Sequence, residues 1–216
     1  MSGFRQFWLG YGLRFWPYIA MLLGLWWLHS AWAAAVIYHV GIALGLAMRP
    51  SAIGQIKLGW NWPLAGLSVV VGAMIFFSVW LITPMILPDS NTVPRALNLT
   101  GLGSLNVLIW FAIYSTIVNP VLEELCWREI VHPVTSSCWR PHVRDFEFMA
   151  YHLVSVFYLF PWNWVMIGGA IPTLAGAAWI WRIMRDRFGG LAIPIFSHAL
   201  ADAAIIGGAI LITLDR

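Results

Sequence analysis

Residues 15–48 read FWPYIAMLLGLWWLHSAWAAAVIYHVGIALGLAM and contain no Asp, Glu, Lys or Arg. A single helix of this length would measure about 50 Å, whereas the hydrocarbon core of a bilayer is about 30 Å thick. We therefore place a break at Leu28-His29-Ser30 and expect two helices that run in opposite directions. This hairpin predicts a chain that folds within a membrane.

The composition of the whole chain also indicates a membrane protein. Of the 216 residues, 61% are apolar and 10% are charged, and the mean hydropathy is +0.78. Soluble domains contain about 45–50% apolar and about 25% charged residues. So little charge excludes an ordinary soluble domain, a nucleic-acid-binding domain and a disordered chain, because none of them can leave so much apolar surface in water. The lipid bilayer is the expected partner, and nucleic acid is not.

The expected fold class is all-α: a polytopic membrane helical bundle of about seven transmembrane helices, within a range of six to eight. Apolar runs bounded by charged residues, Pro and Gly set the limits of the spans. The predicted spans are residues 15–28, 31–48, 63–86, 104–130, 146–160, 163–183 and 190–213. Turn-forming residues over 87–103 and 136–145 place these segments outside the hydrocarbon. We expect residues 1–216 to form a single integral membrane domain.

The distribution of Lys and Arg predicts the orientation. With the N-terminus inside, most cations fall in inner segments, as expected for cytoplasmic loops. The inner cations are Arg5, Arg14, Arg49, Lys57, Arg140, Arg144, Arg182, Arg185 and Arg187; the outer ones are Arg95 and Arg216. We therefore expect an integral protein of a bacterial inner (plasma) membrane, with a cytoplasmic N-terminus.

Charged residues inside the predicted spans are candidates for function, because a charge at depth costs at least about 2.5 kcal/mol. Glu124 and Arg128 are four residues apart, so they share a helix face and can form a shielded ion pair. Glu123 points about 100° away and lacks this partner, which suits a general base acting on water. The alternative is that both glutamates lie at a frayed inner helix end in contact with water.

Two histidines lie in later spans. His198 is four residues before Asp202, so the carboxylate can orient the imidazole, or both can hold an oxyanion or a metal. A lone buried histidine is more often a hydrogen-bonding group between helices than a catalyst. Counted from the inner helix ends, however, Glu123, His152 and His198 all lie about 10–12 Å deep. This common depth indicates one shared site.

These residues form three motifs that resemble a known family. The motifs are EExxxR at 123–128, FxxxH at 148–152 and HxxxD at 198–202. In this order they are similar to the CPBP (CAAX protease and bacteriocin-processing, or Abi) intramembrane endopeptidases, which are related to type II CAAX prenyl proteases. The resemblance implies a catalytic core at residues 104–213 with a polar cavity. It also implies a membrane-anchored or lipid-modified protein or peptide as substrate: a CAAX-like tail, a leader peptide or a C-terminal sorting tail.

The resemblance further implies roles for the motif residues. The implied catalytic residues are Glu123, His152, His198 and Asp202, and the supporting residues are Glu124, Arg128 and Phe148. Glu123 would activate water with help from His152, the HxxxD pair would stabilise the oxyanion, and the Glu124–Arg128 pair would brace the site. Asp202 stands where many members of the family have Asn. Because an ionised carboxylate repels an oxyanion, Asp202 must be protonated, orient His198 or bind a metal.

Two questions stay open at the level of sequence. The enzyme is either a glutamic-type protease or a metal-dependent one with a divalent ion such as Zn²⁺. The candidate metal ligands are Glu123, Glu124, His152, His198 and Asp202. The other question is whether the chain is an enzyme, since a bacteriocin immunity factor or a proton-coupled transporter could use the same buried groups. Glu129, which follows the first motif where the family often has Gly, is a departure from the pattern.

Overall fold

The computed structural model describes residues 2–50, 57–87, 89–131 and 139–214, and the structural statements below concern these residues. Arg216 and residues 136–138 of the predicted loop lie outside them. The elements in chain order are α1 (Ser2–Phe7), η1 (Trp8–Gly12), α2 (Leu13–Met21), η2 (Leu22–Trp27), α3 (Ala31–Met48), α5 (Trp62–Ile86), α6 (Thr92–Leu99), α7 (Leu105–Ile117), α8 (Asn119–Glu124), η3 (Leu125–Val131), α9 (Val143–Leu159), α10 (Trp164–Phe188) and α11 (Ala192–Leu214). The η elements are π-helical, and the described residues contain no strand.

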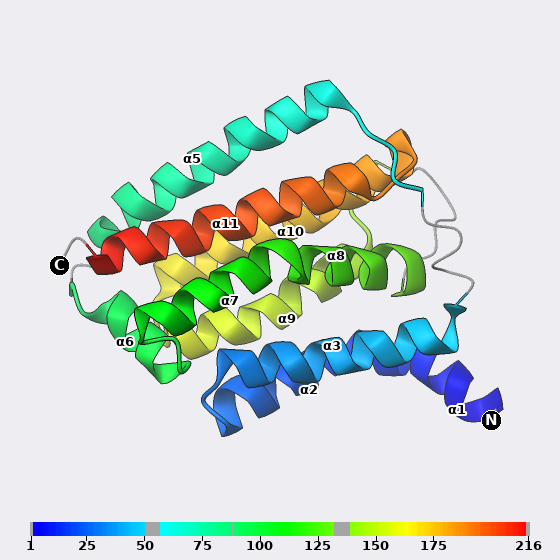
Figure 1. Cartoon of the computed structure of the whole chain (residues 1–216), viewed down its shortest axis with the longest axis horizontal. Coiled ribbons are helices and arrows are strands. Elements are labelled where there is room, and N and C mark those ends of the chain that lie inside the picture. Colours follow the sequence, from blue (N-terminus) through cyan, green and yellow to red (C-terminus); the bar gives the residue numbers. More distant parts are fainter. Residues whose placement is uncertain (1, 51–56, 88, 132–138, 215–216) are drawn as a thin grey trace.

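The long helices lie side by side and form one bundle (Figure 1). Among the described residues, five helical stretches are long and apolar enough to cross a membrane: α3, α5, residues 105–131, α10 and α11. The prediction of an all-α polytopic bundle is therefore confirmed. The other two predicted spans are also helical, as α2 with η2 and as α9, which has 17 residues. That these two cross the membrane stays a prediction.

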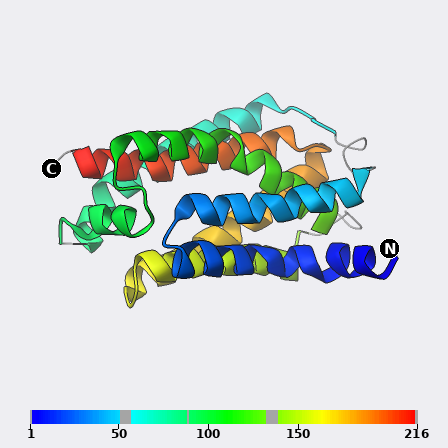
Figure 2. The same ribbon diagram turned by 60° about the horizontal axis from the view of Figure 1, so that its bottom comes forward.

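The predicted break in the N-terminal apolar run is confirmed. η2 ends at Trp27, and His29 takes a left-handed backbone conformation with φ 49°. Ser30 then caps α3, because its hydroxyl accepts a hydrogen bond from the Ala33 amide at 3.1 Å. α2 and α3 pack as an antiparallel hairpin (Figure 2). The close approach depends on Gly24, since a Cβ there would lie 2.2 Å from the Ala34 Cα.

The predicted span at 104–130 agrees with the span-length stretch at residues 105–131, but this stretch is not one regular helix: α7 ends at Ile117, and Val118 separates it from α8. Pro120 lies in the first turn of α8, where its missing N–H costs little, whereas it could not continue α7. Within 87–103, which was predicted only as turns, residues 92–99 form the amphipathic helix α6, whose Val93 and Ala96 are buried.

The two ends of the bundle differ in the elements that they carry (Figure 1). The N-terminus and the α10–α11 junction lie at one end, and α6 and the end of α11 lie at the other. The junction is fixed by the chain before α5, since the Leu191 and Ala192 amides donate to the carbonyls of Lys57 and Leu58 at 2.8 and 2.9 Å. The predicted inner cations belong to α1, α2, the end of α3, the chain before α5, the start of α9 and the end of α10. Their location on the cytoplasmic side stays a prediction.

Candidate active site

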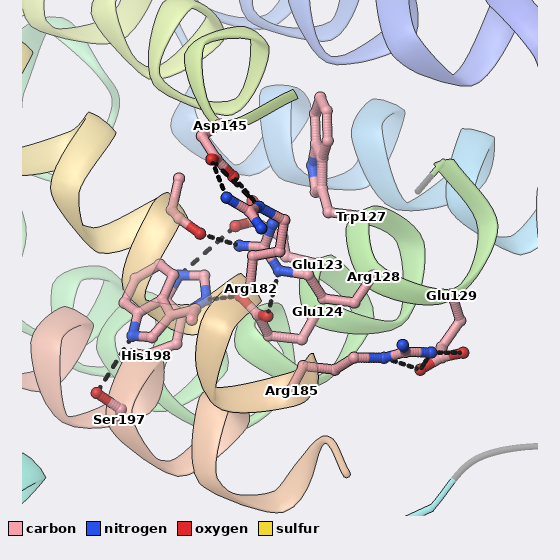
Figure 3. A network of polar contacts seen from close by, with 12 residues as sticks. Glu123, Glu124, Trp127, Arg128, Glu129, Asp145, Arg182, Arg185, Ser197 and His198 are labelled. Carbon is pink, nitrogen blue, oxygen red and sulfur yellow. Dashed lines mark hydrogen bonds and ion pairs between the residues drawn. The ribbon is translucent and has the colours of Figure 1, made fainter. Parts of the chain in front are cut away.

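The ion pair predicted within the first motif forms in the structure. Arg128 donates from Nε to Glu124 Oε2 at 3.0 Å and from Nη2 to the Ala178 carbonyl at 3.1 Å. Figure 3 shows this ion pair, and Glu124 and Arg128 are 0% and 1% exposed. Since both charges are removed from solvent, each depends on the other for compensation.

Glu124 also holds His198. The Glu124 Oε1 atom lies 3.1 Å from His198 Nδ1, and because a carboxylate only accepts hydrogen bonds, Nδ1 is the donor. The imidazole stacks on Trp181, with 4.1 Å between ring centroids, and is 2% exposed. Trp181 in turn donates to the Ser197 hydroxyl at 3.2 Å (Figure 3). His198 is thus fixed on both its face and its edge.

The remaining nitrogen of His198 faces two other carboxylates. Its Nε2 atom lies 3.5 Å from Glu123 Oε2 and 3.7 Å from Asp202 Oδ2. His198 and Asp202 therefore share one face of α11, as their spacing predicted. The structure brings the first and third motifs together around one imidazole.

Glu123 differs from its neighbour in having no arginine paired with it among the described residues. Its Oε1 atom accepts a hydrogen bond from the Tyr151 hydroxyl at 2.8 Å, while Oε2 has no hydrogen-bond partner among the described residues. Glu123 is 3% exposed and Glu124 is 0% exposed, so the interpretation of a frayed helix end in water is wrong. Glu123 keeps one buried oxygen free to accept a proton.

His152, from the second motif, is oriented by its own helix. Its Nδ1 atom lies 2.9 Å from the Phe148 carbonyl, which only accepts, so in the neutral ring Nε2 is an acceptor. The Phe148 ring lies 4.5 Å from the His152 ring, and the Arg128 guanidinium lies 5.6 Å from the Phe148 centroid. Phe148 therefore links the second motif to the first by packing.

A cavity of about 370 Å³ extends from part of this cluster toward the end of the bundle that carries α6. At its polar end the lining residues are Asn119, Glu123, Tyr151, His152 and Asp202. Further along, the walls are mainly apolar side chains of α2, α3, α6, α7 and α11. Glu124, Arg128 and His198 do not line the cavity but lie behind its polar wall.

Sequence reasoning missed several polar side chains of this wall. Tyr151 binds Glu123, and the Asn119 amide donates to Asp202 Oδ2 at 3.3 Å. Both could have been found, because Tyr151 lies within the second motif, next to His152, and Asn119 lies four residues before Glu123 on the same helix face. Tyr38, on α3, accepts from the Trp127 indole at 2.9 Å, and its ring centroid lies 5.6 Å from that of Tyr151. No motif in the first hundred residues pointed to it.

Whether a divalent ion binds at this site stays open, as it was from the sequence. In the described part of the chain, no group of three or more His, Cys, Asp or Glu side chains is arranged to hold a metal ion. Glu124 is occupied by Arg128 and His198, and the His152 Nδ1 atom is bound to a carbonyl.

Ion pairs connect α9 and η3, which carry motif residues, to α10. Asp145, at the start of α9, is 0% exposed and pairs with Arg182 of α10 at 2.9 Å. Glu129 pairs with Arg185 of α10 at 2.8 Å (Figure 3). Glu129, the departure from the family pattern, thus joins η3 to α10.

Comparison with known proteins identifies a domain within the chain. Residues 105–204 match the family model described as type II CAAX prenyl endopeptidase Rce1-like. The match contains all three motifs and confirms the resemblance predicted from them. No curated protein and no solved structure matches the chain.

Proposed function

We propose, on the premise that residues 105–204 form an Rce1-like type II CAAX prenyl endopeptidase domain, that the protein is an intramembrane endopeptidase with a glutamate-activated water. One observation carries this proposal. Glu123, whose Oε2 atom has no hydrogen bond among the described residues, lines a cavity that His152 and Asp202 also line. Such a cavity can hold water and a peptide bond beside a general base.

Glu123 and His152 would share the work of activating the water. A water at the polar end of the cavity can donate one hydrogen to Glu123 Oε2 and the other to His152 Nε2, which leaves a lone pair for the peptide carbonyl carbon. Glu123 takes the proton as the carbon–oxygen bond forms. When the tetrahedral intermediate collapses, the carbon–nitrogen bond breaks and this proton passes to the leaving amine. The products are a carboxylic acid and an amine, so the reaction is a hydrolysis.

The residues behind the wall would act through those that line the cavity. Arg128 compensates the charge of Glu124, and Glu124 fixes the His198 ring. The Nε2 atom of that ring faces the carboxylates of Glu123 and Asp202. Since His198 is 2% exposed and does not line the cavity, its contacts favour a positioning role over the direct oxyanion contact implied by the resemblance. Asp202 would orient His198, one of the three roles left open.

The shape of the cavity supports a substrate with a large apolar part. Most of its wall is apolar, and the polar residues lie at one end. A membrane-anchored or lipid-modified protein or peptide would place its apolar part along this wall and its scissile bond at Glu123. CAAX-like tails, leader peptides and C-terminal sorting tails all meet this description. We further propose a bacterial inner membrane and a cytoplasmic N-terminus, from the distribution of Lys and Arg.

The test uses the full chain in liposomes with two internally quenched peptides. One peptide carries an S-farnesylated CAAX cysteine, and the other carries an apolar transmembrane anchor. We expect the wild-type protein to cleave at least one of them, with the product identified by mass spectrometry, and a correctly inserted Glu123→Ala variant to cleave neither. An immunity factor or a transporter without protease activity would leave both peptides intact.

A further inference from the structure

The polar end of the cavity needs a hydrogen-bond donor that the motifs do not supply. Attack on a peptide bond places negative charge on the carbonyl oxygen, and donors aimed at that oxygen provide much of the catalysis in acyl transfer. Glu123 and Asp202 are both carboxylates in the cavity wall. When ionised they only accept hydrogen bonds, so neither can stabilise the oxyanion.

Three other candidate donors near the polar end are already engaged or lie elsewhere. The Tyr151 hydroxyl has a single hydrogen, which it donates to Glu123 Oε1. His152 uses Nδ1 on the Phe148 carbonyl, and its Nε2 atom is an acceptor in the neutral ring. Arg128 does not line the cavity and donates to Glu124 and to a backbone carbonyl.

Asn119 has the donor that is missing. Its side-chain amide carries two N–H bonds, and a single hydrogen bond, to Asp202 Oδ2 at 3.3 Å, engages the Nδ2 atom. Asn119 lines the cavity and lies one helical turn before Glu123 on the same face of the helix. The second N–H is therefore available at the level where the proposed water attacks.

The neighbouring carboxylate of Asp202 holds Asn119 in place. The Asn119 amide is oriented by its hydrogen bond to Asp202 Oδ2, which α11 contributes. A donor that is oriented in advance costs little reorganisation during reaction.

We propose that Asn119 is a further catalytic residue, whose side-chain amide donates a hydrogen bond to the oxyanion while Asp202 accepts from the same amide and fixes its direction. This inference rests on the proposed function. It also gives Asp202 a role in which its carboxylate does not face the oxyanion, since its Oδ2 atom is directed at Asn119 and His198.

The experiment measures kcat and KM for the peptide that the wild-type protein cleaves. We expect Asn119→Ala to lower kcat about 100- to 1,000-fold with little change in KM, because the donor acts in the transition state. Asn106→Ala is the matched control, since Asn106 carries the same amide at an exposed position of α7 and does not line the cavity. This control should retain the wild-type kcat.

An exchange of the two polar groups separates a catalytic role from a structural one. Asn119→Asp removes the donor and places two carboxylates side by side, so kcat should again fall. The double variant Asn119→Asp with Asp202→Asn restores one amide and one carboxylate, and should recover kcat about tenfold over Asn119→Asp alone. Equal loss in the double variant would overturn the proposal.

Two further outcomes distinguish this inference from the proposed function. If Glu123→Gln is inactive but Asn119→Ala keeps kcat within about twofold of wild type, the inference on Asn119 is wrong and the protease assignment stands. A change confined to KM would also overturn it, because that result assigns Asn119 to ground-state binding. If the wild-type protein cleaves neither peptide, the proposed function itself fails.

Discussion

Two adjacent glutamates with the same chemistry have different surroundings. Glu124 faces Arg128 and His198, so both of its oxygens are occupied. Glu123 has one oxygen on Tyr151 and one without a partner among the described residues. The i,i+4 spacing of the EExxxR motif predicts this division, because only the second glutamate shares a helix face with the arginine.

The ion pair of the first motif predicts a large effect on stability. Arg128→Gln would leave the Glu124 carboxylate buried without its cation, which destabilises a protein by about 3–5 kcal/mol. The measurement is the unfolding of the purified protein in detergent. Arg95→Gln is the control, since the Arg95 side chain is 65% exposed and its surface pair with Asp89 is worth about 0–1 kcal/mol. An equal effect of both variants would contradict the account.

Other residues of the site could not be predicted from sequence. Tyr38 and His39 are neighbours on α3, and their contacts Trp127 and Tyr114 lie 89 and 75 residues further along the chain. Hydrophobic periodicity places such residues on a helix but does not identify the helix that they face. The packing of α3 against the motif helices determines which helix these residues face, and this packing is a property of the tertiary fold.

At the scale of elements, local chemistry explains both the successes and the failures of the predicted spans. The break at His29 followed from the length of the apolar run and from Ser30, whose side chain caps α3. The division of residues 104–130 was missed because apolar periodicity continues across Pro120. α6 was missed because turn-forming residues surround it, although its buried Val93 and Ala96 give it an apolar face.

The N-terminal hairpin predicts the effect of one glycine. Gly24→Ala would place a Cβ 2.2 Å from the Ala34 Cα, so η2 and α3 must separate. We expect a loss of about 1–3 kcal/mol, as for other overpacked sites, measured by unfolding in detergent. Gly66→Ala is the matched control because nothing lies within 4 Å of its added Cβ. Identical stability of the two variants would show that the hairpin is not closely packed.

At the scale of the whole molecule, the matched domain and the N-terminal hairpin line one cavity. Residues 105–204 carry the three motifs, whereas α3, outside the match, contributes Tyr38. Met21 and Leu25 of the hairpin also line the cavity. That residues 104–213 form the catalytic core therefore stays a prediction. Residues of the first hundred also line the cavity.

The orientation of the bundle predicts which loops meet the cytoplasm. After replacement of the native cysteines, Arg187→Cys, at the exposed end of α10, should react with a membrane-impermeant maleimide only from the cytoplasmic side. Ser90→Cys, an exposed position before α6, should react only from the opposite side. Labelling of both positions from one side, or the reverse pattern, would show that the assigned orientation is wrong.

The central claim is that Glu123 is the general base, and the cleavage rate of Glu123→Gln tests it most directly. The matched control is Glu129→Gln, which removes a carboxylate on η3 that binds Arg185 and does not line the cavity. We predict that Glu123→Gln, folded and inserted like wild type, loses about 10²–10⁴-fold in rate, while Glu129→Gln keeps most of its activity. Full cleavage by Glu123→Gln would contradict the mechanism.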